Sequence, residues 1–170
     1  ITIQKAALLG EAAVFSGKPL TIPAVKTSAA GFTWSAWVKP AAISQQAELF
    51  SQSGVSIKLD GQKLTLSIGK TAVSGGEIKP AVWQHLAVTV AGGKATLYVN
   101  GVVVGNGDAV LVDTQADVKV GQGYNGELDE LQLANVARSA DWIKLAASGQ
   151  GAESQLVTIL AAEGEDGKEG

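Results

Sequence analysis

The stretch that most constrains the fold is WQHLAVTVAGGKATLYVNGVVVG, residues 83–105. Within it Leu86, Val88 and Val90 alternate with small or polar residues, which is the period of a half-buried strand. A Gly-Gly pair and then an Asn-Gly pair separate the apolar runs, and Asn-Gly suits the positive φ angles of a two-residue hairpin. The stretch therefore predicts three antiparallel strands joined by tight turns, and with them an all-β fold.

Short apolar runs recur along the rest of the chain, and turn residues separate them at the spacing of about 8–12 residues that is typical of sandwiches. An Asp60-Gly61 pair marks a further hairpin. The predicted strands lie at residues 13–15, 20–22, 32–38, 49–52, 55–60, 63–68, 71–73, 83–90, 96–99, 102–105, 109–112, 118–121, 127–133 and 156–160. This pattern predicts two stacked antiparallel sheets.

One short helix is predicted at residues 139–147. Ser139 is a suitable N-cap and Asp141 favours the positive end of the helix, whereas Gly149 ends it. The chain has 170 residues, which predicts a single domain over 1–162. The acidic, glycine-rich residues 163–170 are expected to form a tail or linker.

Composition excludes several classes of function. A net charge of -3 with a single arginine, Arg138, disfavours nucleic acid as a partner, because phosphate binding needs clustered Lys and Arg. The chain has no cysteine, and therefore neither a disulfide scaffold nor thiolate chemistry. No apolar run approaches about 18 residues, so this stretch is not expected to insert into a membrane. Whether the parent protein is membrane-anchored stays open.

Four segments resemble one family: AAVFSGKPLTIP (12–23), FTWSAWVKP (32–40), WQHLAVTVAGGKATLYVNG (83–101) and GYNGELDELQLANVARSADWI (123–143). In this order they look like the LamG-like jelly-roll module of the concanavalin A-like lectin/glucanase superfamily. The resemblance implies a two-sheet antiparallel jelly-roll sandwich with a curved face. It also implies a non-catalytic, extracytoplasmic binding module, periplasmic or on the cell surface, that recognises a glycan or a protein surface. Some members of the family hold a structural calcium ion.

A narrower resemblance concerns ARSADWIKLAASGQGAESQLV, residues 137–157, and the acidic tail. These segments are similar to modules of bacterial envelope proteins, some of which are fused to a TolQ/ExbB-type proton-channel segment. The resemblance implies an alternative function, a structural or sensory periplasmic domain coupled to such a channel.

Strand alternation selects candidate ligand-binding residues. If the strands at 32–38, 83–90, 96–99 and 127–133 share a sheet, one outer face collects a set of aromatic and polar side chains, namely Trp37, His85, Tyr98, Glu130 and Gln132. Aromatic rings cover the apolar face of a sugar while amide and carboxylate groups bind its hydroxyls. In the alternative interpretation this face packs under a loop or the 139–147 helix, and Trp37 and His85 are buried and structural.

Asp129 is predicted to point toward the core with Leu131 and Leu133. A buried carboxylate needs a hydrogen bond, a counter-charge or a metal. Asp129 is therefore the candidate ligand of a structural calcium ion, together with backbone carbonyls. The alternative is a carboxylate that accepts backbone N–H groups at a turn.

No catalytic residues are expected. His85 is the only histidine, and the chain lacks a G-x-S-x-G motif that would place a nucleophilic serine. Glycosidases need two carboxyl groups about 5–9.5 Å apart across the scissile bond. Asp129 and Glu130 are adjacent in a predicted strand and would face opposite sides of the sheet. The sequence therefore predicts no enzyme and no cofactor apart from an optional calcium ion.

Overall fold

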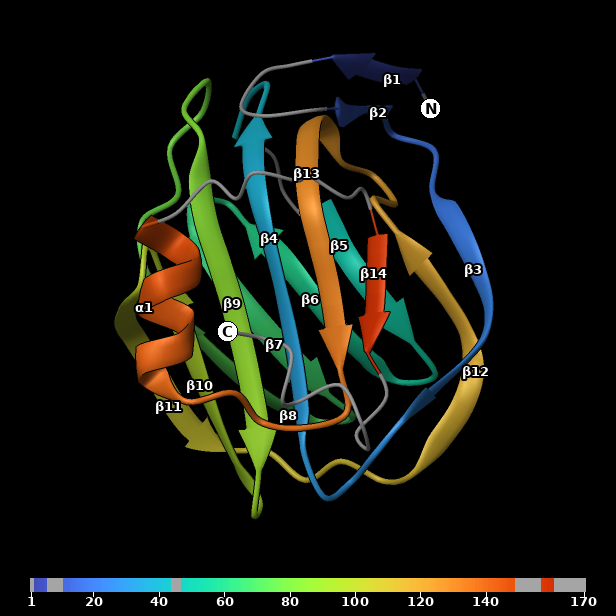
Figure 1. Cartoon of the computed structure of the whole chain (residues 1–170), viewed down its shortest axis with the longest axis vertical. Coiled ribbons are helices and arrows are strands. Elements are labelled where there is room, and N and C mark those ends of the chain that lie inside the picture. Colours follow the sequence, from blue (N-terminus) through green and yellow to red (C-terminus); the bar gives the residue numbers. More distant parts are fainter. Residues whose placement is uncertain (1, 6–10, 44–46, 149–156, 161–170) are drawn as a thin grey trace.

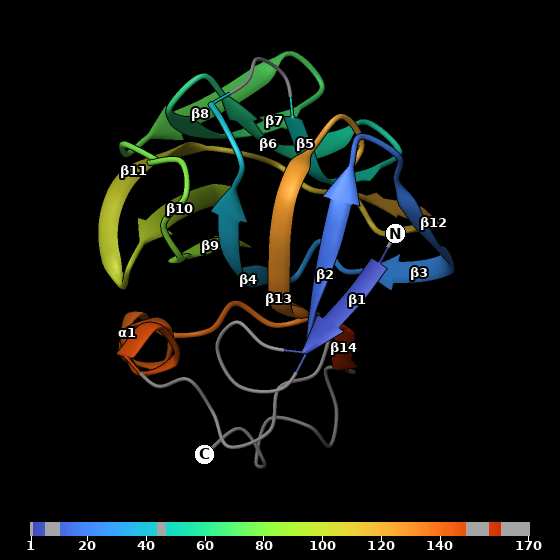
Figure 2. The ribbon, with the colours of Figure 1, turned by 90° about the horizontal axis from the view of Figure 1, so that it is seen from above.

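The computed structural model describes residues 2–5, 11–43, 47–148 and 157–160, and it confirms the predicted two-sheet sandwich. Sheet A contains, in order, β1 (Thr2–Lys5), β2 (Glu11–Ser16), β13 (Asn125–Ala134), β4 (Phe32–Pro40), β9 (Gln84–Ala91), β10 (Lys94–Val99) and β11 (Val102–Asp108), with β14 (Val157–Leu160) parallel to β13. Sheet B contains β3 (Leu20–Thr27), β12 (Thr114–Val120), β5 (Ala47–Gln52), β6 (Val55–Asp60), β7 (Lys63–Ile68) and β8 (Thr71–Gly75). Figures 1 and 2 show the two layers.

The core lies between the sheets and follows from strand alternation. In β4, Phe32, Trp34 and Val38 point inward and are at most 2% exposed. Leu49 and Ile57 of sheet B are fully buried in the same cluster. Burial of each large apolar side chain contributes about 1.5–3 kcal/mol, so the two inner faces hold the sheets together.

Glycines allow the two sheets to meet edge to edge at β8 and β11. A Cβ on Gly75 would lie 2.1 Å from the carbonyl oxygen of Val104, and one on Gly105 would lie 3.0 Å from that of Ser74. Backbone is the neighbour in both cases, so a side chain at Gly75 would collide with β11, and one at Gly105 would fit only tightly. This side of the sandwich is consequently closed.

The predicted helix is present as α1 (Ala140–Ser148), one residue later than expected. It begins after Ser139, whose hydroxyl accepts the N–H of Trp142 at 3.0 Å. Ile143 is fully buried against Ala87 and Tyr98, so α1 lies on the outer face of sheet A over β9 and β10 (Figures 1 and 2). No helix among the described residues is long and apolar enough to cross a membrane.

Two strand predictions differ from the structure. Residues 109–112 do not form a strand, although Ala109 and Leu111 are buried and alternate with the exposed Val110 and Val112. Ala109 donates its N–H to the turn residue Gly93 rather than to a neighbouring strand, so the segment has no ladder partner. β1 was not predicted. The predicted tail at 163–170 lies outside the described residues.

Candidate functional site

The predicted face exists on sheet A, because β13, β4, β9 and β10 are neighbours. Trp37 is opposite His85 in register, and their rings meet edge to face with centroids 5.3 Å apart. Tyr98 is opposite Ala87 in β9, and Gln132 is opposite Ser35 in β4. Strand alternation thus placed Trp37, His85, Tyr98 and Gln132 correctly on one side of the sheet.

The aromatic residues on this face are buried. Trp37 is 8% exposed, His85 3% and Tyr98 6%. Tyr98 packs against Ile143 of α1. The side chains therefore do not form an exposed platform, which agrees with the alternative interpretation that this face is covered. A ligand-binding role for Trp37, His85, Tyr98, Glu130 and Gln132 stays a prediction.

The predicted orientation of Asp129 is wrong because β13 contains a bulge. Asp129 is opposite Trp37 and Gln132 is opposite Ser35, so one extra residue lies between them. Alternation with an inward Asp129 implies an outward Leu128, but Leu128 is fully buried in the core and Asp129 lies on the same face as Trp37. The Asp129 carboxylate accepts the backbone N–H of Glu130 at 2.8 Å. Within the described residues, no group of three or more His, Cys, Asp or Glu side chains could hold a metal ion.

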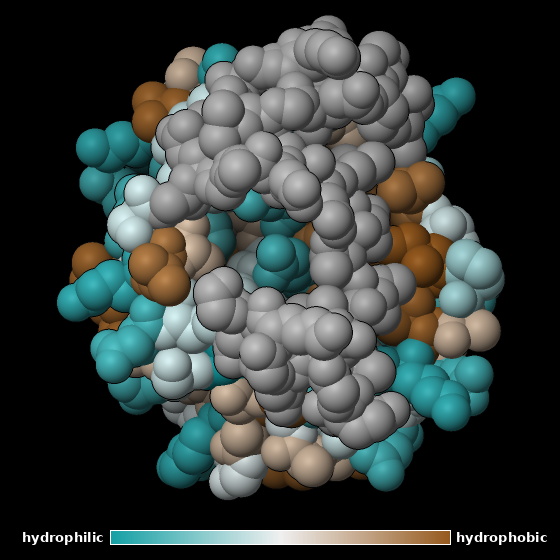
Figure 3. Space-filling view, viewed as in Figure 1, coloured by the Kyte–Doolittle hydropathy of each residue, from teal (hydrophilic) through white to brown (hydrophobic). Residues whose placement is uncertain are grey.

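Glu130 is the extra residue of the bulge, and its environment is unusual. Its φ of +50° is in the left-handed region, which favours glycine. One carboxylate oxygen, Oε2, is shielded from solvent and has no hydrogen-bond partner among the described residues. Burial, together with the negative charge of Asp129, raises the pKa of Glu130 from 4.5 to about 7. Figure 3 shows hydrophilic side chains in the middle of this face, over β4 and β13.

His85 and Trp37 also have unpaired ring nitrogens. Nδ1 of His85 and Nε1 of Trp37 are buried, and neither has a hydrogen-bond partner in the part of the chain that the structure describes. Burial lowers the pKa of His85 from 6.5 to about 4, so the imidazole is neutral at pH 7. The face is therefore a buried polar cluster next to a strained glutamate, and its effect on stability depends on pH.

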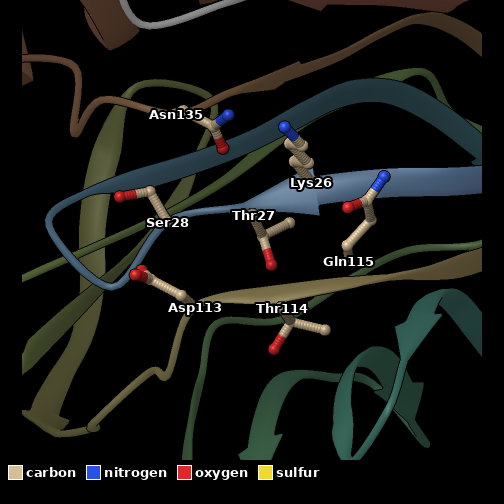
Figure 4. A pocket seen from close by; sticks show the side chains of 7 residues that line it. All are labelled: Lys26, Thr27, Ser28, Asp113, Thr114, Gln115 and Asn135. Carbon is tan, nitrogen blue, oxygen red and sulfur yellow. The ribbon is translucent and has the colours of Figure 1, made fainter.

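A separate pocket of about 420 Å³ lies where β3 ends, β12 begins and β13 ends (Figure 4). Its lining is polar: Lys26, Thr27, Ser28, Asp113, Thr114, Gln115 and Asn135. In Figure 4 the side chains of Lys26 and Gln115 point to one side of the ribbon and those of Thr27 and Thr114 to the other. We call this the lower pocket, after its place in Figure 1.

Three side chains of the lower pocket are available to a ligand. Lys26 is opposite Gln115 in the β3–β12 pair, and both are exposed. Together with Asn135, they make no side-chain hydrogen bond to another described residue. An ammonium and two amides supply several donors and two acceptors, which suits a ligand rich in hydroxyl groups.

The other polar residues hold the rim of the lower pocket in place. Asp113 accepts the N–H of Ala29 at 2.8 Å, and Ser28 accepts that of Ala30 at 3.0 Å. Thr27 donates to the buried Gln52 at 2.9 Å. These bonds fix the loop after β3 and the start of β12, so Lys26 and Gln115 project from an ordered frame.

The segment after β13 is clamped to the start of β4. The hydroxyl of Thr33 donates to the carbonyl of Val136 at 2.7 Å and accepts the N–H of Arg138 at 2.9 Å. A Cβ on Gly31 would lie 2.9 Å from the backbone nitrogen of Ala137, so the two loops are in close contact. Asn135 is consequently held at the pocket by its neighbours.

Sequence reasoning did not identify the lower pocket. Its three available side chains come from three segments that are distant in sequence, and no motif joins them. Only the placement of β3 next to β12, and of the end of β13 beside both, brings them together.

Comparisons with known proteins agree with the geometry. The profile of the family described as the concanavalin A-like lectin/glucanases superfamily (Laminin_G_3) matches residues 16–144. A search of curated protein sequences found no significant match. Domain 4 of AbnA, a GH43 extracellular arabinanase from Geobacillus stearothermophilus, solved in complex with arabinotriose, superimposes with a TM-score of 0.72 and 25% identity, covering 86% of this chain and 81% of that one.

Two further solved structures share the fold at lower identity. One is a putative carbohydrate binding protein from Bacteroides ovatus, with a TM-score of 0.71 and 17% identity over 85% of this chain and 49% of that one. The other is a SAP-like pentraxin from Limulus polyphemus, with a TM-score of 0.65 and 17% identity over 87% and 83%. At this identity the likeness shows the fold alone.

Proposed function

We propose that this chain, which belongs to the concanavalin A-like lectin/glucanase superfamily, is a non-catalytic module that binds a neutral carbohydrate in the lower pocket. The observation that carries the proposal is the convergence of Lys26, Gln115 and Asn135, without protein partners among the described residues, in a pocket of about 420 Å³. The likeness to a domain solved with arabinotriose supports carbohydrate as the ligand class.

The chemistry of the pocket supports binding rather than turnover. Asp113 is the one carboxylate that lines it, and one of its oxygens already accepts a backbone N–H. Glycoside hydrolysis needs a pair of carboxyl groups on either side of the bond. The lower pocket instead offers donors and acceptors for several hydroxyls at once. We infer that the module works outside the cytoplasm, where polysaccharides are exposed to binding proteins.

The first prediction tests the pocket directly. The double variant K26A/Q115A is expected to bind its preferred oligosaccharide at least tenfold more weakly, because it loses an ammonium and an amide that each contribute about 1 kcal/mol or more. Binding is measured by calorimetric titration with arabinotriose, xylotriose, cellotriose and mannotriose.

The matched control is Q62A/K63A, which removes the same two residue types from the exposed β6–β7 turn. It is expected to bind like the wild type within twofold. Equal affinity of K26A/Q115A and the control would contradict the assignment of the lower pocket. No binding of any of the four sugars by the wild type would contradict the proposed function.

A further inference from the structure

A second pocket, of about 390 Å³, lies at the other end of β13. Its walls combine apolar surface from Val14, Pro40 and Ala81 with the polar side chains of Lys39, Asn125 and Glu127. We call it the upper pocket, because β4 ends and β13 begins at the top of Figure 1. An apolar wall with a few polar groups is the usual lining of a site for a small organic ligand.

The charged pair in the upper pocket is loosely joined. Lys39 and Glu127 are opposite each other in the β4–β13 ladder, and Nζ lies 3.8 Å from Oε2. This distance is longer than a hydrogen bond, so the ammonium and the carboxylate keep unused donors and acceptors. The side chains are 35% and 23% exposed, which leaves them reachable from solvent.

The backbone around the upper pocket is tightly held. Ala81 has a φ of +61° and donates its N–H to the carbonyl of Pro40 at 2.7 Å. Ala41 donates its N–H to the carbonyl of Asn125 at 2.9 Å. A non-glycine residue in the left-handed region is costly, and such strain concentrates at functional sites. The pocket is thus formed before any ligand arrives.

We propose that the upper pocket is a second carbohydrate site, which makes the module bivalent. A sugar ring would place its C–H surface against Pro40 and Ala81, and its hydroxyls would bond to Lys39, Asn125 and Glu127. This inference rests on the proposed function, because it assigns the same ligand class to a second site. The charge pair is balanced, and this favours a neutral sugar over an ionic one.

The two pockets are too far apart to bind one sugar residue together. Asn125 is the first residue of β13 and Asn135 directly follows the last one. They are therefore about 30 Å apart along an extended strand. Each pocket would therefore hold a different chain, or distant parts of one polysaccharide. Two linked sites raise the apparent affinity for a polymer well above that for a short oligosaccharide.

The test follows the side-chain amide resonances of Asn125 and Asn135 in the nitrogen-15-labelled protein during titration with arabinotriose, xylotriose, cellotriose and mannotriose. Both resonances are expected to shift in the wild type. The K39Q/E127Q variant should lose the Asn125 shift and keep that of Asn135, and K26A/Q115A should do the reverse. The control K94Q/D108N, which removes another cross-strand ion pair, should keep both shifts.

Each other outcome is decisive. If only Asn135 shifts in the wild type, or if both shifts vanish in K26A/Q115A, the second site is refuted and the proposed function stands. If neither resonance shifts with any of the four sugars, both proposals fail. Thermal unfolding of each variant shows whether a lost shift comes from a lost fold.

Discussion

Replacing Glu130 by glycine is expected to raise the free energy of unfolding at pH 8 by about 2 kcal/mol. Two costs disappear together. The left-handed backbone at the bulge, with φ of +50°, costs a non-glycine residue about 1–2 kcal/mol. A half-buried carboxylate whose pKa is raised to about 7 adds about 1–2 kcal/mol once solvent screening is allowed for. The greater freedom of glycine in the unfolded chain offsets roughly 0.5–1 kcal/mol of the gain.

The variant E130Q separates the two costs, because it removes the charge and keeps the strained backbone. A raised folded-state pKa means that the folded protein prefers the protonated carboxyl. The penalty is therefore absent below about pH 4.5, grows between pH 4.5 and 7 and is complete above pH 7. Urea unfolding should show E130Q about 1–2 kcal/mol more stable than the wild type at pH 8 and equal to it at pH 4. The same difference at both pH values would contradict the assignment.

His85 has the opposite dependence on pH. Its pKa is lowered from 6.5 to about 4 in the folded protein, so folding requires the neutral imidazole. The free energy of unfolding is therefore unaffected above pH 6.5 and decreases as the pH falls toward 4, because the unfolded chain binds the proton first. Between pH 4.5 and 6.5 the contributions of Glu130 and His85 therefore oppose each other. Between pH 7 and 4 the wild type is therefore expected to lose only about 1–2 kcal/mol, whereas E130Q, which retains only the histidine contribution, loses about 3 kcal/mol.

The sequence predicted which side chains share the outer face of sheet A, and burial of this face was one of its two interpretations. Period-2 alternation is a local property, so it assigned Trp37 and His85 each to a face of its own strand, whereas the pairing of the two strands was an assumption that the structure confirms. The Ser139 cap likewise predicted α1. The position of α1 on Ala87 and Tyr98 depends on the path of the chain after β13, which no local pattern records.

The bulge in β13 and the two pockets were beyond sequence reasoning for a different reason. A bulge of this kind is recognised by a glycine at its left-handed position, and here the residue is Glu130. Alternation was therefore extended through the bulge from Leu131 and Leu133, and it assigned Leu128 and Asp129 to the wrong faces of the sheet. Each pocket combines residues from strands that are far apart in sequence and become neighbours only in the folded sheet. Lys26 of β3 and Gln115 of β12 are an example.

Replacing Gly126 by alanine is expected to destabilise the protein by more than about 3 kcal/mol. Gly126 is opposite Pro40 in the β4–β13 ladder and has a φ of +149°. A Cβ there would lie 2.5 Å from the carbonyl oxygen of Lys39 and 2.8 Å from Cα of Pro40. Both neighbours are backbone, so relief requires the two strands to separate at this end. The new methyl group would also lie 2.8 Å from Oη of Tyr124.

Gly17 is the matched control, because its φ is +99° and no atom of the described residues lies within 4 Å of the position of a Cβ. G17A therefore carries the backbone cost alone, about 1–2 kcal/mol. Urea unfolding of both variants isolates the collision as the difference between them, and a difference below about 1 kcal/mol would contradict the close approach of β13 to β4.

Because Lys39 and Pro40 line the upper pocket, the same strand separation should abolish the arabinotriose shift of Asn125 in folded G126A while that of Asn135 persists. The two ends of β13 would then be shown to bind independently.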